Sequence, residues 1–101
     1  MTPQIAFKIL TAEQWSEFER DQIFLGSQVD IADGYIHLST AEQLHETLAK
    51  HFAGQENLKI AEVDLGIVGT VLRWEPSRGG QLFPHLYGPL PMTAIRSVQS
   101  H

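Results

Sequence analysis

The stretch from Asp33 to Thr40, DGYIHLST, restricts the fold of this chain more than any other. Its Asp33-Gly34 pair is a strong turn signal, and the residues after it alternate between polar and apolar side chains, as a short strand does. Ile36 and Leu38 would face one side of that strand. The other side would carry a polar row: Tyr35, His37 and Ser39. The stretch predicts a turn and a strand with a histidine near its end, which is typical both of a functional site and of a hydrogen-bonded core histidine.

A helix is predicted to follow this strand, from about Thr40 to Phe52. Ser39 followed by Glu42 three residues later is typical of a capping box, which satisfies free N–H groups at the start of a helix. An apolar stripe runs along the predicted helix: Ala41, Leu44, Leu48 and Phe52. We expect this stripe to cover a sheet and to share a core with Ile36 and Leu38.

Composition limits the classes of function. A chain of 101 residues, 43% hydrophobic and 19% charged, is typical of one globular domain, here 1–101. The formal net charge of -5 argues against bulk nucleic acid as a partner, and the lack of cysteine excludes disulfides and thiolate chemistry. No apolar stretch approaches membrane-spanning length and no charged leader precedes one, so we expect no membrane partner and a cytoplasmic location. A monomer or weak homodimer is expected.

The N-terminal part predicts a strand at 5–10 and a helix from Ala12 to about Asp21, capped by Thr11 and Gln14. Trp15 and Phe18 fall on one stripe of that helix and are expected in the core. Residues 26–30 look like loop.

Four more strands are predicted in the C-terminal half, at 58–65, 71–75, 83–87 and 95–98. Pro84 lacks an N–H group and so places the 83–87 strand at a sheet edge. About six strands and two main helices, segregated rather than alternating, predict an α+β fold.

Three of the predicted strands carry polar rows. Besides the row around His37, these are the pairs Arg73 with Glu75 and His85 with Tyr87. Buried positions admit such residues only when they are paired or when they face a cleft, so one shared cleft would explain all three rows. The alternative is that each row faces bulk solvent, as one side of an antiparallel sheet often does. The glycine-rich segment 77–80 would be the lid of such a cleft.

The chain resembles the family catalogued as domain of unknown function 952, small domains of bacterial type. Four segments carry the resemblance and together span most of the sequence: TAEQW at 11–15, DGYIHLST at 33–40, LRWEPSRGG at 72–80 and FPHLYGPLP at 83–91. Members of that family look like compact relatives of the ADP-ribosyltransferase fold. The resemblance therefore implies a split, mostly antiparallel sheet and a cleft for a nicotinamide dinucleotide.

The resemblance also implies roles for the polar rows. His37 with Ser39 stands where those transferases place a residue that holds a ribose. They use a late glutamate as well, and no glutamate follows Glu75 here, so Glu75 could serve only if its strand lies across the cleft. The catalytic candidates are His37, Glu75 and His85. The ligand-binding candidates are Tyr35, Ser39, Arg73, Arg78 and Tyr87.

The expected function is thus the binding of a small nucleotide of the NAD or ADP-ribose type, with NAD as a substrate for ADP-ribosyl transfer or other processing. A non-catalytic module that binds a ligand or a partner needs the same cleft without a catalytic acid, and it stays the alternative. A metal site built from His37, His85 and Glu75 has suitable ligand types, but no local ligand spacing supports it, so no metal is expected.

Overall fold

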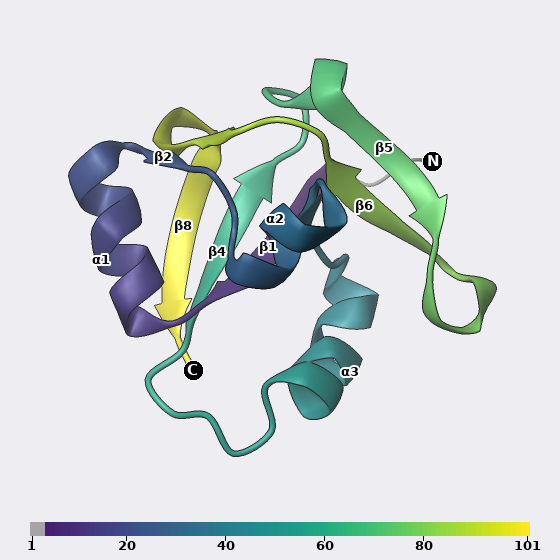
Figure 1. The fold of residues 1–101 in the computed structure, drawn as a ribbon, viewed down its shortest axis with the longest axis horizontal. Helices are drawn as coiled ribbons and strands as arrows, with labels where there is room; N and C mark the ends of the chain where they lie inside the picture. Colours follow the sequence, from purple (N-terminus) through teal and green to yellow (C-terminus); the bar gives the residue numbers. More distant parts are fainter. Residues whose placement is uncertain (1–3) are drawn as a thin grey trace.

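The computed structural model describes residues 4–101 and has an α+β fold (Figure 1). The described residues form three α-helices and eight strands in three antiparallel sheets. The helices are α1 (Ala12–Asp21), α2 (Gln28–Asp33) and α3 (Ala41–His51). The strands are β1 (Ile5–Leu10), β2 (Ile23–Phe24), β3 (Ile36–His37), β4 (Lys59–Asp64), β5 (Leu72–Pro76), β6 (Leu82–Leu86), β7 (Leu90–Pro91) and β8 (Ile95–Ser100). The α+β class is confirmed, whereas the expected sheet of about six strands is divided among three sheets.

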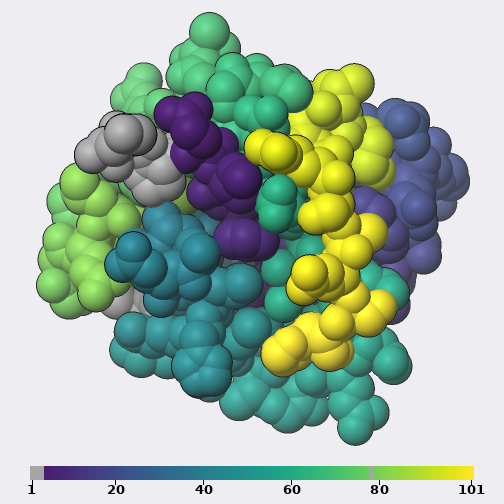
Figure 2. Space-filling model, turned by 180° about the vertical axis from the view of Figure 1, so that it is seen from behind, coloured from purple at the N-terminus to yellow at the C-terminus, as the bar shows by residue number. Residues whose placement is uncertain are grey.

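The largest sheets each contain three strands, in the orders β1-β4-β8 and β3-β6-β5, and the third is the short pair β2-β7. Two backbone hydrogen bonds join the larger sheets, from Phe7 N to Ser39 O (2.7 Å) and from Ser39 N to Phe7 O (2.9 Å). The back view shows β8 open on the surface (Figure 2). No helix among residues 4–101 is long and apolar enough to cross a membrane.

The two longer helices begin at the same tetrapeptide, Thr-Ala-Glu-Gln. Thr11 and Thr40 are the N-caps, and each exchanges hydrogen bonds with the glutamine three residues later, Gln14 or Gln43. The cap at Thr11 is confirmed. The cap predicted at Ser39 was wrong by one residue, because the Ser39 backbone is already paired with Phe7.

The core contains the side chains predicted for it near the N-terminus but not those predicted for α3. Trp15, Phe18, Ile36 and Leu38 are buried, as expected. The α3 stripe of Leu44, Leu48 and Phe52 is only half-buried and Ala41 is exposed, so that prediction was wrong. The buried residue of α3 is Gln43, whose side-chain amide donates to the carbonyl of Leu82.

The loop predicted at residues 26–30 is present only at Gly26 and Ser27, because a helix begins at Gln28. Ser27 and Asp30 form a capping box that opens α2, and Gly34 closes the helix in the left-handed conformation with a φ of 90°. The Asp33-Gly34 turn is therefore the end of a helix. A serine and an aspartate three residues apart were the signal in the sequence.

Pro84 lies in the central strand of its sheet, so its predicted edge position was wrong. Proline has no N–H to donate, and the regular pairing of β3 with β6 ends at His37 opposite His85, one residue before Pro84. The Pro84 carbonyl still accepts a hydrogen bond from Leu38 N (3.1 Å). The proline therefore fits where the neighbouring strand stops.

A candidate site at a pair of histidines

The strand register of the β3-β6-β5 sheet brings the three polar rows together. His85 on β6 lies opposite His37 on β3 and opposite Arg73 on β5. Directly opposed residues of antiparallel strands share a face, and residues two positions along share it too. Tyr35, Glu75 and Tyr87 therefore join the same face. The prediction that His37 and His85 lie together is confirmed, and the three rows converge as the shared-cleft hypothesis requires.

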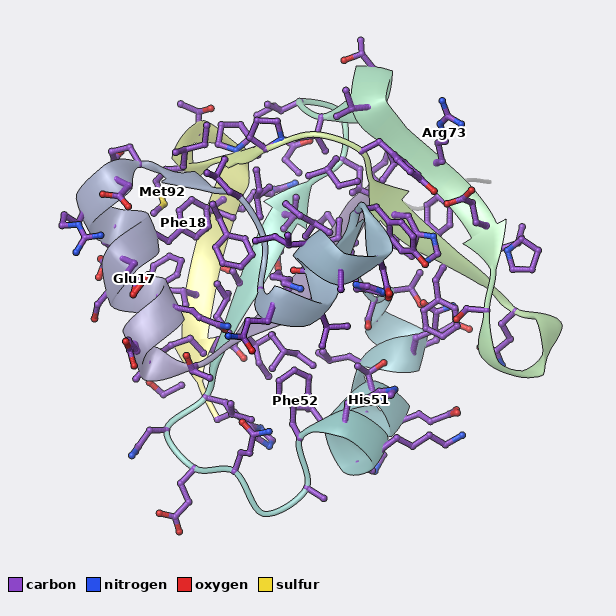
Figure 3. All side chains as sticks on the ribbon, viewed as in Figure 1. Glu17, Phe18, His51, Phe52, Arg73 and Met92 are labelled. Atoms are coloured by element: carbon purple, nitrogen blue, oxygen red, sulfur yellow. The ribbon has the colours of Figure 1, made fainter. Side chains whose placement is uncertain are left out.

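Tyr35 is the centre of an aromatic cluster on this face. Its ring stacks on His85, with centroids 4.1 Å apart, and lies 4.7 Å from His37 and 5.2 Å from Tyr87. The guanidinium of Arg73 lies 4.9 Å from the centre of the Tyr87 ring. Figure 3 shows Arg73 projecting from β5 away from the body of the molecule. The pKa of Tyr35 is raised by burial and then by the negative charges of Asp33 and Glu75.

His37 is held by Asp30, a residue that the sequence analysis did not single out. The His37 Nδ1 atom lies 2.6 Å from Asp30 Oδ1, and its backbone N donates to the same oxygen over 3.1 Å. Burial alone would raise the pKa of Asp30, but hydrogen bonds from His37 and the charge of Lys8 hold it well below its usual range. Because Asp30 stays ionised, Nδ1 must carry the proton between them.

Lys8 is the other member of this buried group that sequence reasoning missed. Its Nζ donates to Asp30 Oδ2 (2.9 Å) and to the carbonyl of His37 (3.0 Å). Its position in an alternating strand gave no sign of burial, since a lysine there normally faces solvent. Burial lowers the pKa of Lys8, although the charge of Asp30 acts in the opposite direction.

His85 has its own carboxylate partner. Its Nδ1 lies 2.8 Å from Glu75 Oε1, and the Tyr87 hydroxyl donates to the same oxygen over 2.6 Å. The hydrogen bonds from Tyr87 and then from His85 lower the pKa of Glu75, and the bond to Glu75 in turn raises the pKa of Tyr87. The strand β5 therefore brings the Glu75 carboxylate to His85 and Tyr87, but Glu75 does not line the hollow described below, and its catalytic role stays a prediction.

The two histidines differ in access. The side chain of His37 is 36% exposed and that of His85 only 5%, so His37 is the one that a ligand can reach directly. The His37 Nε2 atom lies 3.0 Å from Oδ2 of Asp33, which is half exposed. Only an imidazolium can donate to both Asp30 and Asp33. A ligand that displaced Asp33 would bind at Nε2 of a ring whose Nδ1 is already bonded to Asp30.

Both histidines line a hollow of about 1020 Å³ between the helices and β1. All five phenylalanines of the chain line it too, namely residues 7, 18, 24, 52 and 83. Phe18 comes from α1 and Phe52 follows α3, so different elements supply its walls (Figure 3). Exposed aliphatic side chains from β2 to α2 stand at the same hollow: Ile23, Leu25, Val29 and Ile31. The surface of the hollow is therefore mostly apolar, and polar side chains line it at the histidines and also along α1, including Glu13, Glu17 and Asp21.

The remaining candidate residues, Ser39 and Arg78, lie outside the aromatic cluster or outside the described side chains. Ser39 is buried, and its hydroxyl lies 3.0 Å from that of Thr47. Ser39 also lines the hollow. The Arg78 side chain lies outside the described part of the structure, and the lid at 77–80 stays a prediction. Among the described residues, no group of three or more His, Asp or Glu side chains is placed to hold a metal ion.

The fold and the site define a class of small α+β domain in which two strand histidines are each bound to a carboxylate at one end of an apolar hollow. The chain belongs to the family described as "Protein of unknown function (DUF952)", whose model matches residues 9–98. The expected family is thereby confirmed. Neither the family match nor the solved structures below support a relation to ADP-ribosyltransferases.

Two structures of protein CC0527 from Caulobacter crescentus are similar to this chain. Its crystal structure is 45% identical, covers 95% of this chain and 84% of that chain, and has a TM-score of 0.92. Its solution NMR structure is 44% identical, covers 96% and 84%, and has a TM-score of 0.85. No curated protein matches the chain.

Proposed function

We propose that this domain binds a ribose-bearing nucleotide of the NAD or ADP-ribose type, with the ribose at the His37 end of the hollow. The observation that carries the proposal is the meeting of two carboxylate-bound histidines and two tyrosines beside a hollow of about 1020 Å³. Small-molecule sites are commonly concave and mostly apolar with a few polar groups, and they measure about 300–1000 Å³.

The polar groups suit a ribose better than a bare phosphate chain. Ribose hydroxyls both donate and accept hydrogen bonds, so they suit the half-exposed Asp33 carboxylate and also His37 Nε2, which accepts in the neutral ring and donates in the imidazolium. The phenylalanines that line the hollow supply faces on which a base can stack. Arg73 is the cation of the aromatic cluster and would meet a phosphate at its outer edge.

Titration calorimetry with NAD and with ADP-ribose tests this proposal. We expect binding by the wild-type protein, and a loss of about 1.5–3 kcal/mol of binding free energy in His37→Ala and in Arg73→Ala, the range for hydrogen bonds to charged groups. His45→Ala is the matched control, because His45 is an exposed histidine of α3 that does not line the hollow. An absence of heat and of thermal shift at millimolar ligand would refute the proposal.

A second candidate, binding without catalysis, is favoured by how fully the acid and base groups are engaged. Glu75 accepts from both His85 and Tyr87, and the ring of His37 lies between two carboxylates. A base for transfer chemistry would have to be released from these bonds first. Incubation with NAD separates the two: release of nicotinamide supports transfer or hydrolysis, and binding without release supports a binding module.

A further inference from the structure

Lys8 presents an energetic problem that the proposed site does not explain. Its side chain is only 7% exposed and its partner Asp30 only 2%. A buried ion pair often stabilises a protein no better than apolar residues of the same size would, because both charges lose their hydration. An aliphatic residue at position 8 of β1 would avoid this cost. We therefore look for the role of the Lys8–Asp30 pair in its contacts with neighbouring residues.

The carboxylate of Asp30 is fully occupied, and its occupants point to His37. Its Oδ1 takes the backbone N and the ring Nδ1 of His37, while Oδ2 takes Ser27 N (2.8 Å) and Lys8 Nζ. A carboxylate has about four places for donors, so each is used. Lys8 and Ser27 therefore fix Oδ2, and with it they fix the direction in which Oδ1 meets the ring.

Lys8 also holds His37 directly. Its Nζ donates to the His37 carbonyl, so the backbone of His37 is held at N by Asp30 and at O by Lys8. The ring is held at Nδ1 by Asp30. Three bonds from one buried pair thus set the place of a single residue, the more exposed of the two site histidines.

We infer that Lys8 is a positioning residue: it clamps Asp30 and, through Asp30, fixes the ring orientation and the charge of His37. Lys8 shares the negative charge of Asp30 with the ring and repels a second proton there. Without Lys8, Asp30 would have the ring of His37 as its nearest cationic partner. The inference rests on the proposed function only for what His37 binds, because the state of the ring can be measured without a ligand.

Every charged or titratable group that faces the ring bears on this argument. Asp30 and Asp33 come from α2, Lys8 from β1 and His85 from β6, and the Tyr35 ring lies tilted beside that of His37. The Asp33 carboxylate favours a charged ring, whereas Lys8 opposes it. Removing Lys8 leaves both carboxylates unopposed, so the direction of the expected change is clear.

The first measurement uses ¹⁵N shifts of the histidine rings in the wild-type protein, at a pH where the rings are neutral. We expect the His37 ring to carry its proton on Nδ1, because Asp30 accepts there. A neutral ring with its proton on Nε2 overturns the inference at once. This result does not depend on any ligand or on any variant.

The second measurement compares Lys8→Met, which keeps the length of the side chain and removes its charge. At a fixed pH, the ¹⁵N shifts of the His37 ring in this variant should move toward those of a doubly protonated ring, while those of the His85 ring, which is held by Glu75, should stay as in wild type. Unchanged ring ¹⁵N shifts of His37 in the folded variant overturn the inference, as would equal changes at both rings.

The double variant Lys8→Met/Asp30→Leu separates positioning from simple stabilisation, and also serves if Lys8→Met does not fold. Replacing both partners removes the unpaired charge, but the N–H groups of Ser27 and His37 still lose their acceptor, so the protein should melt below wild type and above the single variant Asp30→Leu, which also leaves Lys8 unpaired. If wild type binds ADP-ribose, the double variant should bind it roughly 10–100-fold more weakly, the loss typical when a partner that orients a histidine is removed. Recovery of both stability and affinity would overturn the inference. Should wild type bind neither nucleotide, the proposed function fails and the ring measurements still decide the role of Lys8.

Discussion

Asp30→Asn is the substitution whose cost follows most directly from the structure. Asparagine keeps the shape of the side chain but removes the charge, and its amide nitrogen is a donor where aspartate has an acceptor. Whichever way the amide turns, that nitrogen faces donors, either Lys8 and the Ser27 N–H or the two N–H groups of His37. The variant therefore leaves at least two donors without an acceptor and Lys8 without its counter-charge.

The expected loss of stability is about 3–5 kcal/mol, the cost of removing one partner from a buried ion pair. Domains of this size are stable by about 5–15 kcal/mol, so the variant should fold but be marginal. At about 4–8 °C per kcal/mol, its melting temperature should fall by at least about 12 °C. Asp33→Asn is the matched control on the same helix, because Asp33 is exposed and should cost within about 0.5 kcal/mol.

Urea unfolding at several pH values supplies the decisive assay. The pKa of Asp30 is lowered in the folded state, so its contribution is fully present above the unfolded value of about 3.9 and is lost as the pH falls toward the folded value. The gap between wild type and Asp30→Asn should therefore narrow below about pH 4. A gap under about 1 kcal/mol at pH 7, or one that does not change on acidification, would refute the reasoning about the buried pair.

Three further outcomes are expected. Trp15→Ala should cost about 3–5 kcal/mol, because Trp15 is 9% exposed and packs edge-on against Phe18; a thermal melt equal to that of Glu17→Ala, an exposed neighbour on α1, would show that the helix face was misread. Thr40→Ala should cost about 1 kcal/mol through the lost capping box, and a change within error in urea unfolding would argue against Thr40 as the cap. Glu75→Gln should lower the pH at which Tyr87 ionises, since the bond to Glu75 raises the Tyr87 pKa; ultraviolet titration of the tyrosines checks this, and an unchanged curve contradicts it.

How much the sequence could predict depended on the range of the interactions involved. Helix caps and strand alternation are local patterns. The capping box of Thr11 with Gln14 and the two-sided strand around His37 were predicted correctly, and the cap of α3 was predicted within one residue. The convergence of His37 with His85 was also predictable, because alternation fixes a face once the strands pair. The pairing itself was inferred only from the shared polarity of the rows.

The missed features depend on contacts between distant segments. Lys8 is buried because Asp30, 22 residues later, meets it, and no local pattern marks such a partner. The half-buried stripe of α3 has the periodicity of a core helix, and only tertiary packing shows that Gln43 is its buried residue. The helix α2 is the exception, since Ser27 and Asp30 offered a local signal that was not used.

The junction between Phe7 and Ser39 has a kinetic consequence. Two backbone bonds there join the sheet that contains Lys8 to the sheet that contains both histidines. If the sheets open as one cooperative unit, the amide hydrogens of Phe7 and Ser39 exchange with solvent only as fast as those in the middle of β4. If the sheets part separately, these two amides exchange first, and a nucleotide that spans the hollow should slow their exchange.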